Sequence, residues 1–200
     1  SIALNKSFIS DLSVIETKLL IQTIINNIFF INVYYSKIFW INLHDFILSS
    51  KSGKKIIISN SIKILNDRDL FFIIKDNIET SKKVRIIDKL NWKDNIFSIC
   101  KIDKHPEDVS RNKIIIDRSI INSGIYVREW SKGDRMITND GINRKVKKLL
   151  INNKIPVAYK KSIPIVVNSD NKILWIPLIA YGKNLINNNK LAMIRCDNGF

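Results

Sequence analysis

The most informative stretch of the sequence is Tyr126-Val127-Arg128-Glu129-Trp130-Ser131-Lys132-Gly133-Asp134-Arg135. Its Gly-Asp pair predicts a tight turn, because glycine adopts positive φ freely and aspartate can hydrogen-bond its own backbone. The residues before the turn should be extended, so Arg128 and Trp130 project from one face of a strand. Arg135 follows just past the corner. Two guanidinium groups beside an indole are suited to bind a phosphate and to stack on a ribose or a base.

The same spacing admits a purely structural interpretation. Trp130 would then be a core residue, and Arg128 would pair with Glu129 or Asp134. Spacing alone does not separate the two interpretations, because either face of a strand can be buried.

A basic helix is predicted next, at residues 143–152, and Pro156 stops it. Its inward-facing residues would be Val146, Leu149, Leu150 and Ile151, and its basic residues are Arg144, Lys145, Lys147 and Lys148. From residue 128 to residue 161 there are ten basic and three acidic side chains, a local charge of 10 − 3 = +7. Like charges on one helix face repel, and a polyanion would relieve that repulsion. The alternative is an ordinary solvated helix face.

The charge of the whole chain is regional. The formal net charge is +15 over 200 residues, which favours a polyanionic partner such as nucleic acid. Residues 1–50 hold three basic and three acidic side chains, so the whole excess lies in residues 51–200. The chain is also rich in Ile, Asn and Lys, residues with AT-rich codons, so its total charge is weaker evidence than the placement of that charge.

The pattern of the whole chain predicts an α+β protein. Helices are expected at residues 13–28, with Ser13 and Glu16 as a capping box, and at residues 36–50. The stripe expected to face the core of the first helix is Val14, Leu19, Leu20, Ile24, Ile25 and Ile28. Short Ile/Phe-rich runs at 54–59, 62–65 and 70–75 predict a β-meander.

Further strands are expected at 84–88, 96–102, 113–117 and 124–130, with a hairpin at 163–168 and 172–177. Within this hairpin Trp175 should be a core residue. The polar segment 103–112 contains a proline and is predicted to be a linker. The expected organisation is therefore a helical and β-meander region at 1–103 and a small mixed domain at 112–200.

No catalytic or metal-binding group is predicted. His44 and His105 stand alone in the sequence, and Cys100 and Cys196 lack metal-ligand spacing. The two cysteines are expected to be free thiols in a reducing cytoplasm. The most apolar stretch, residues 19–35, is too polar to cross a bilayer, and the basic helix lacks the large apolar face of a membrane-surface helix.

In its last third the chain resembles the C-terminal domain of tRNA(Ile)-lysidine synthases. That domain has the pattern R-x-W-x-x-G-D-R, then Gly-Met, Lys-Lys, an apolar helix, K-[IV]-P and finally P-[IV]-[IV]…I-x-W-[IV]-P. The matching segments of this chain are 128–135, Gly141-Ile142, Arg144-Lys145, 154–156, 164–167 and 173–177. Order and spacing agree over about fifty residues, apart from a short deletion after Ile142. Residues 14–70 are more loosely similar to the middle of the family, especially its Bacteroidetes-like members.

The resemblance implies a tRNA-binding and tRNA-positioning role for this segment. The complete enzyme would ligate lysine to C2 of the wobble cytidine of tRNA(Ile), changing codon recognition from AUG to AUA. It would use ATP with magnesium, and this segment would bind neither ATP nor lysine. The predicted RNA-contacting residues are Arg128, Trp130, Arg135, Arg144, Lys145, Lys147 and Lys154.

Two departures from the family pattern bear on function. Lys148 and Asn152 stand where the family usually has acidic residues, and Leu178 and Ala180 stand where many members have Gly and Arg. The family's ATP loop, S-G-G-x-D-S, has no match here; the nearest segment is Ser52-Gly53-Lys54. The alternative to a part of the synthase is a stand-alone basic RNA-binding module without catalytic activity. An upstream in-frame S-G-G-x-D-S segment would distinguish the two.

Overall fold

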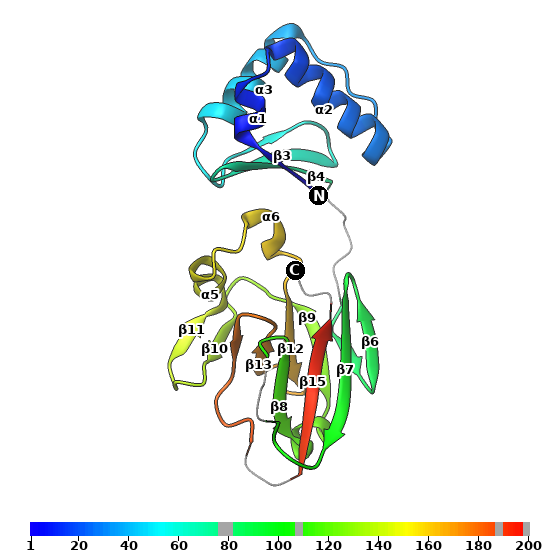
Figure 1. Ribbon diagram of the computed structural model, residues 1–200, viewed down its shortest axis with the longest axis vertical. Coiled ribbons are helices and arrows are strands. Elements are labelled where there is room, and N and C mark those ends of the chain that lie inside the picture. The colour runs from blue at the N-terminus through cyan, green and yellow to red at the C-terminus, as the bar shows by residue number, and fades with distance from the viewer. Residues whose placement is uncertain (76–81, 107–109, 187–189, 198–200) are drawn as a thin grey trace. The chain divides into compact units, whose positions relative to one another are not determined.

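A computed structural model describes residues 1–75, 82–106, 110–186 and 190–197. The chain forms two compact units, residues 1–79 with 156–158, and residues 80–155 with 159–200. The mixture of helices and antiparallel sheets confirms the α+β class (Figure 1).

The first unit contains a four-stranded antiparallel sheet. Its strands are β1 (Ile2–Asn5), β2 (Lys55–Ile57), β3 (Ile62–Asp67) and β4 (Leu70–Lys75), in the order β1-β4-β3-β2. The adjacent pairs β2–β3 and β3–β4 confirm the predicted meander. Arg68 has φ 53°, in the two-residue turn between β3 and β4. Strand β1 was not predicted, since four residues carry too short a pattern.

Three helices pack on this sheet: α1 (Lys6–Ser10), α2 (Val14–Phe29) and α3 (Lys37–Ser49). The capping box of α2 is as predicted: the Ser13 side chain accepts from the Glu16 backbone, and Glu16 Oε2 accepts from Ser13 N at 2.8 Å. Such local capping can be predicted because the bonds join residues three apart.

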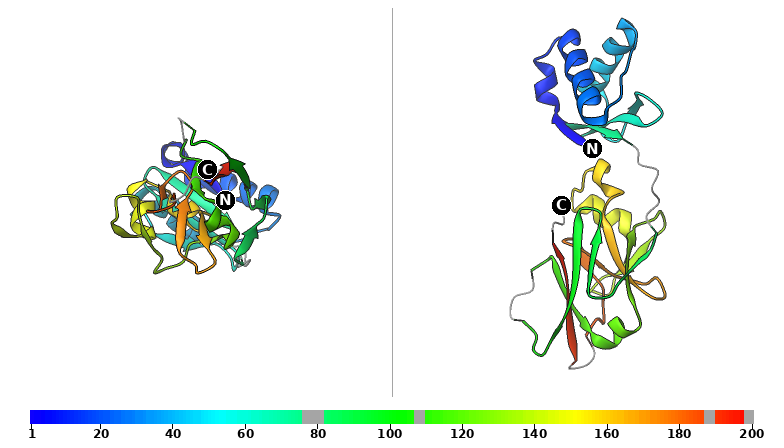
Figure 2. Two further views of the ribbon diagram at one scale, coloured as in Figure 1. Left: turned by 90° about the horizontal axis from the view of Figure 1, so that it is seen from below. Right: turned by 90° about the vertical axis from the view of Figure 1, so that its right-hand side faces the viewer.

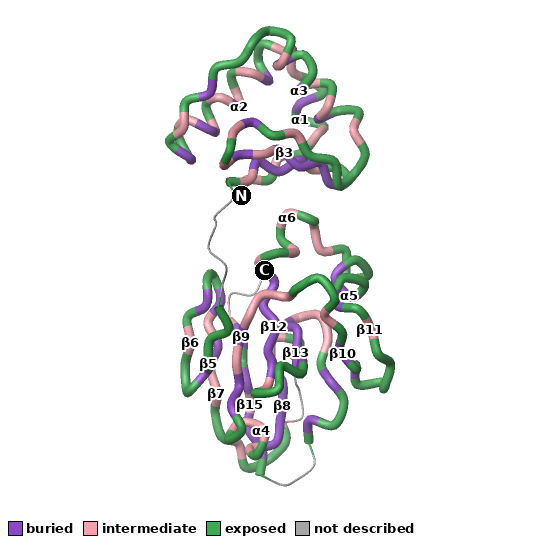
Figure 3. The backbone as a smooth tube through the Cα atoms, turned by 180° about the vertical axis from the view of Figure 1, so that it is seen from behind, coloured by how far each residue is buried: buried purple, intermediate pink, exposed green. Residues whose placement is uncertain are grey.

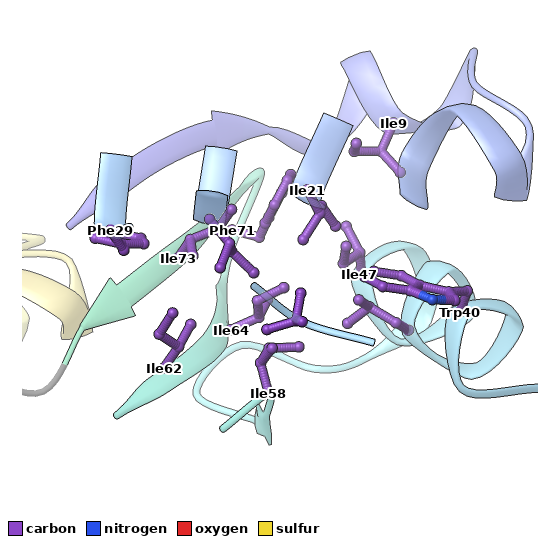
Figure 4. Close-up of a cluster of buried hydrophobic side chains, with 13 residues drawn as sticks. Ile9, Ile21, Phe29, Trp40, Ile47, Ile58, Ile62, Ile64, Phe71 and Ile73 are labelled. Carbon is purple, nitrogen blue, oxygen red and sulfur yellow. The ribbon is translucent and has the colours of Figure 1, made fainter. Parts of the chain in front are cut away.

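The core of the first unit corrects the predicted face of α2. Ile21, Ile25 and Phe29 are buried in it, together with Trp40 of α3 and Ile64 of β3 (Figure 4). Val14, Leu20 and Ile24 pack partly against this core, as expected, but Leu19 and Ile28 are exposed. The helix carries apolar residues around most of its circumference, so periodicity alone left its orientation open.

The second unit has two sheets with a shared core. One has the order β14-β13-β12-β9-β5 and the other β6-β7-β15-β8. Figure 2 shows the red C-terminal strand β15 beside green strands. The first sheet comprises β5 (Val84–Ile86), β9 (Ile125–Glu129), β12 (Pro164–Asn168), β13 (Ile173–Ile176) and β14 (Ala180–Tyr181). The second comprises β6 (Lys89–Trp92), β7 (Asn95–Ile102), β8 (Lys113–Asp117) and β15 (Leu191–Asp197), and α4 (Arg118–Asn122) follows β8.

Trp175 lies in the core between these sheets, as predicted. Its side chain is 2% exposed, and its ring makes an edge-to-face contact with Phe97 of the other sheet, with centroids 6.5 Å apart. Both cysteines are free: Cys100 is exposed and Cys196 is buried. Burial, together with the neighbouring Asp197, raises the pKa of Cys196 to about 12.

The other face of the five-stranded sheet is covered by a small lobe. It consists of a hairpin of β10 (Arg135–Ile137) and β11 (Asn143–Lys145), followed by α5 (Val146–Asn152). The helix α6 (Val157–Lys160) comes next in the chain, and its first two residues belong to the first unit. Met136, Val146 and Leu150 pack with Ile165 and Ile176 of the sheet in a further buried cluster. The lobe contains residues 143–152, which were predicted to form a basic helix (Figure 1).

The two compact units divide the chain earlier than the predicted linker. Strands β5, β6 and β7, expected in the region 1–103, pair with β9, β15 and each other in the second unit. Such long-range pairing cannot be read from local composition. Of the predicted linker 103–112, residues 107–109 lie outside the described part. The functional division into a middle region and a C-terminal domain remains a proposal.

Candidate nucleic-acid interface

The turn after β9 is closed by an ion pair between Arg128 and Asp134. Arg128 Nη1 donates to Asp134 Oδ2 at 2.8 Å, and Nη2 donates to Asp134 Oδ1 at 2.9 Å. Nη1 also donates to the Glu129 carbonyl at 2.8 Å, and Nε donates to Asn171 Oδ1 at 2.8 Å. The two charged side chains are 12% and 15% exposed. Four donated hydrogen bonds leave this guanidinium little capacity for a phosphate.

The same carboxylate organises the backbone of the turn. Ser131 N donates to Asp134 Oδ2 at 2.6 Å, and Asp134 N donates to the Ser131 carbonyl at 3.1 Å. Gly133 has φ 105°, a conformation that side chains with a Cβ rarely adopt. The Gly-Asp turn is therefore confirmed, and Arg128 stabilises it.

Trp130 is also held within the protein. Its indole Nε1 donates to the carbonyl of Lys160, and its ring is partly buried against the cluster beneath α5. The predicted RNA contact of two guanidinium groups beside an indole stays a prediction at these positions. Arg128 and Trp130 follow the structural interpretation in their contacts.

Arg135 and Arg144 project from the neighbouring hairpin. Arg135 is exposed, and it donates from Nε to Asn143 Oδ1 and from Nη2 to the Asn143 carbonyl, each at 3.1 Å. Arg144 pairs with Asp140, with Nη2 2.6 Å from Oδ2. Hydrogen bonds from Arg144 and then Thr138 hold the pKa of Asp140 well below its usual range, and the same pair raises the pKa of Arg144.

An open hollow lies on the surface between this hairpin and α5. Its volume is about 510 Å³, and it is lined by Arg135, Ile142, Asn143, Arg144, Lys145, Lys148 and Asn152. Four of these seven side chains are basic and none is acidic. Lys145 and Lys148 are exposed and have no hydrogen-bond or ion-pair partner among the described residues. We call this surface the basic hollow.

The structure corrects the predicted basic helix at its start. Residues 143–145 form strand β11, and the helix begins at Val146. Asn143, Arg144 and Lys145 pair with Ile137, Met136 and Arg135 of β10, which fixes them as strand. Val146, Leu149 and Leu150 are buried as expected, whereas Ile151 is 50% exposed. Figure 3 shows the mixture of buried and exposed residues in α5.

Three of the predicted contact residues, Arg135, Arg144 and Lys145, meet at the basic hollow. Lys147 is exposed on α5 without lining it, and Lys154 follows α5 at φ 56°. Lys148 was omitted from the predicted set, although it lines the hollow with Asn152. Their signal was present in the sequence: they are four apart on one helix face, and both depart from the usual acidic residues of the family.

Ser52-Gly53-Lys54 has a single glycine and does not supply the Gly-rich cradle that a triphosphate needs. No three His, Cys, Asp or Glu side chains gather into a metal-ligand group in the described ranges. No helix in this part of the chain is long and apolar enough to span a membrane.

Comparisons with known proteins match the segment that carries this interface. The sequence model of the TilS substrate C-terminal domain matches residues 125–197. The tRNA(Ile)-lysidine synthase of Thermotoga maritima is 40% identical over 55 residues, which are 28% of this chain and 13% of that protein. The synthase of Oceanobacillus iheyensis is 36% identical over 87 residues, 42% of this chain and 18% of that protein.

The fold agrees as well. The structure titled "Crystal structure of TILS C-terminal domain" aligns with a TM-score of 0.52 at 20% identity, covering 57% of this chain and 95% of that one. The chain spans less than a fifth of the length of these two synthases. Residues 125–197 are therefore similar in sequence to the TilS substrate C-terminal domain, and the relatives that the chain matches are tRNA(Ile)-lysidine synthases. The likeness to the solved domain extends this similarity to the fold.

Proposed function

We propose that this chain binds and positions tRNA(Ile) for a cytoplasmic lysidine synthase, and that the basic hollow contacts the tRNA backbone. The complete enzyme would ligate lysine to C2 of the wobble cytidine at the expense of ATP, so that the tRNA reads AUA instead of AUG. ATP, magnesium and lysine would be bound by a part of the enzyme outside these residues.

The observation that carries the proposal is the charge of the hollow. Arg135, Arg144, Lys145 and Lys148 converge on it without an acidic lining residue. Among the described residues, Arg144 is the one of these four that pairs with a carboxylate, and that carboxylate, Asp140, does not line the hollow. Basic side chains gathered on a concave surface gain free energy from phosphate binding through counterion release.

Salt dependence tests the contact directly. Binding of tRNA(Ile) to the chain should weaken steeply with salt, with a slope of the log–log plot of about −0.7 to −0.9 per phosphate contacted. The double variant Arg135→Ala/Lys145→Ala should weaken binding and make this slope shallower by about one to two. Filter binding over a range of salt concentrations measures both quantities.

The matched control is Arg85→Ala/Lys89→Ala, which removes the same charge from exposed positions on β5 and β6 of the same unit. It should reduce the slope less than the hollow variant does. An affinity for tRNA that is independent of salt would exclude phosphate binding at the hollow. Equal effects of the two double variants would assign the attraction to overall charge.

A further inference from the structure

A second cavity lies in the same unit, with a volume of about 540 Å³. Its walls come from β8, from the segment 138–144, from α5 and from the residues that surround β14. A volume of this size falls within the range of about 300–1,000 Å³ that is common for small-ligand sites. None of the roles assigned above uses this cavity.

The charge of its lining favours an anion. Arg111, Lys113 and Arg144 line the cavity, and none of the described lining residues is acidic. Arg111 and Lys113 have no side-chain hydrogen bond or ion pair with any described residue. Two unpaired cations at a concave site can bind a phosphate without first breaking an internal ion pair.

The remaining lining suits a planar base. Ile179, Leu149 and Trp175 contribute apolar atoms to the lining, and Tyr181, which is 52% exposed, lines the cavity with them. Asn139 holds this tyrosine, because its Nδ2 donates to the Tyr181 hydroxyl at 3.2 Å and its backbone N donates to the Tyr181 carbonyl at 3.1 Å. An oriented, exposed tyrosine is a stacking platform for an unpaired base.

The cavity adjoins the basic hollow. Arg144 lines both, so phosphates bound at the hollow and a nucleotide bound in the cavity would have this side chain in common. We propose that the cavity receives one unpaired nucleotide of the bound RNA, with its base against Tyr181 and its phosphate at Arg111 and Lys113. This inference rests on the proposed RNA binding and adds to it a site for a single base.

Two hairpin RNAs test the inference on the whole chain, one with a short single-stranded extension and one whose extension carries the same phosphates but no bases. The wild type should bind the base-bearing RNA about tenfold more tightly, given the usual strength of base–aromatic stacking. Tyr181→Ala and Ile186→Trp, which fills the cavity from a 44% exposed lining position, should each remove most of that preference. Fluorescence anisotropy measures both RNAs, and thermal melting checks that the variants fold.

Tyr34→Ala is the control, because this tyrosine is 85% exposed in the first unit, and it should keep the preference. Equal affinity of the wild type for the two RNAs would overturn the inference, as would a preference that persists in both cavity variants. Failure of the basic hollow is a separate result, seen as lost binding of the base-free RNA. Saturation-transfer NMR with AMP and CMP identifies the source: binding of the free nucleotide that Ile186→Trp abolishes, without any preference between the RNAs, would assign the cavity to a free nucleotide instead.

Discussion

Arg128 and Arg135 are the two ends of one eight-residue motif, yet their side chains make different contacts in the structure. Arg128 is mostly shielded from water and donates four hydrogen bonds, to Asp134, Glu129 and Asn171. Arg135 is exposed at the basic hollow, and within the described part of the chain its guanidinium donates to Asn143 alone. Residues that are close in a motif can therefore divide between stabilising a turn and presenting charge.

The turn at residues 128–134 and the elements around the basic hollow are connected through the backbone. The turn that Arg128 closes is the entry to the hairpin, and Val146 N donates to the Asp134 carbonyl at 2.9 Å, so the start of α5 is tied to the same residue. This contact joins two backbone atoms and does not involve the Arg128 side chain, so it can hold the start of α5 when that side chain is removed.

The largest expected effect is the loss of the partly buried ion pair between Arg128 and Asp134. Arg128→Ala leaves Asp134 without its main partner, and it should lower the free energy of unfolding of the second unit by about 2–4 kcal/mol, since both groups are mostly shielded from water. Urea unfolding followed by tryptophan fluorescence measures this loss. The RNA affinity of the folded protein should stay within about twofold of wild type, since a group already satisfied internally adds little to phosphate binding.

Arg135→Ala is the counterpart, with unfolding changed by less than about 0.5 kcal/mol, as for most surface substitutions, and with weaker RNA binding. Weaker RNA binding by Arg128→Ala with an unchanged unfolding curve would contradict the assignment of Arg128 to the stability of the turn.

The next effect concerns Lys148, one of the residues that depart from the family pattern. Lys148→Glu restores an acidic side chain inside the hollow and should weaken RNA binding about tenfold, or about 1.4 kcal/mol. Lys147→Glu makes the same change of charge one residue away on α5 but outside the lining, and it should cost less than about threefold. Anisotropy titrations at one ionic strength compare the two, and equal losses would show that the hollow is not the contact surface.

Features that depend on nearby residues, such as the turn that Arg128 closes, could be predicted from the sequence. The Gly-Asp turn, the Ser13 capping box and the core position of Trp175 depend on neighbouring residues or on strong apolar patterns, and all three were read correctly. The sequence also offered both roles for Arg128. In the structure Arg128 also donates to Asn171, which lies 43 residues away and is a partner that local spacing cannot reveal.

The hollow could be predicted only in part. Residues 143–145 carry a helical pattern but pair as a strand with β10, because the partner strand decides the conformation. That pairing brings Lys145 opposite Arg135 and brings Lys148 to the same hollow. The cavity beside it combines segments from residue 105 to residue 186, and no local pattern brings such segments together.

A smaller effect is expected at Trp130, whose contacts, like those of Arg128, lie within the protein. Trp130→Phe keeps an aromatic ring in the cluster under α5 but removes the Nε1 donor to the Lys160 carbonyl. The second unit should lose about 1 kcal/mol of stability, the usual net value of one hydrogen bond, and the RNA affinity should not change measurably. Loss of RNA affinity at unchanged stability would instead return Trp130 to a stacking role.

The smallest expected effect concerns the pH dependence of the ion pair between Arg144 and Asp140. The pKa of Asp140 is lowered from 3.8 in the folded state, chiefly by the Arg144 hydrogen bond, so its contribution to stability is complete above the unfolded pKa and falls as the pH drops through the folded one. Between about pH 5 and pH 8 the ion pair should therefore stay intact, and the difference in stability between wild type and Asp140→Asn should stay constant, shrinking only in more acid solution. The same variant frees Arg144 and should tighten RNA binding by about twofold to threefold, within the range of an exposed ion pair. Thermal melts across pH measure the first difference, and a gap that changes near neutral pH would mean that another group controls the hairpin.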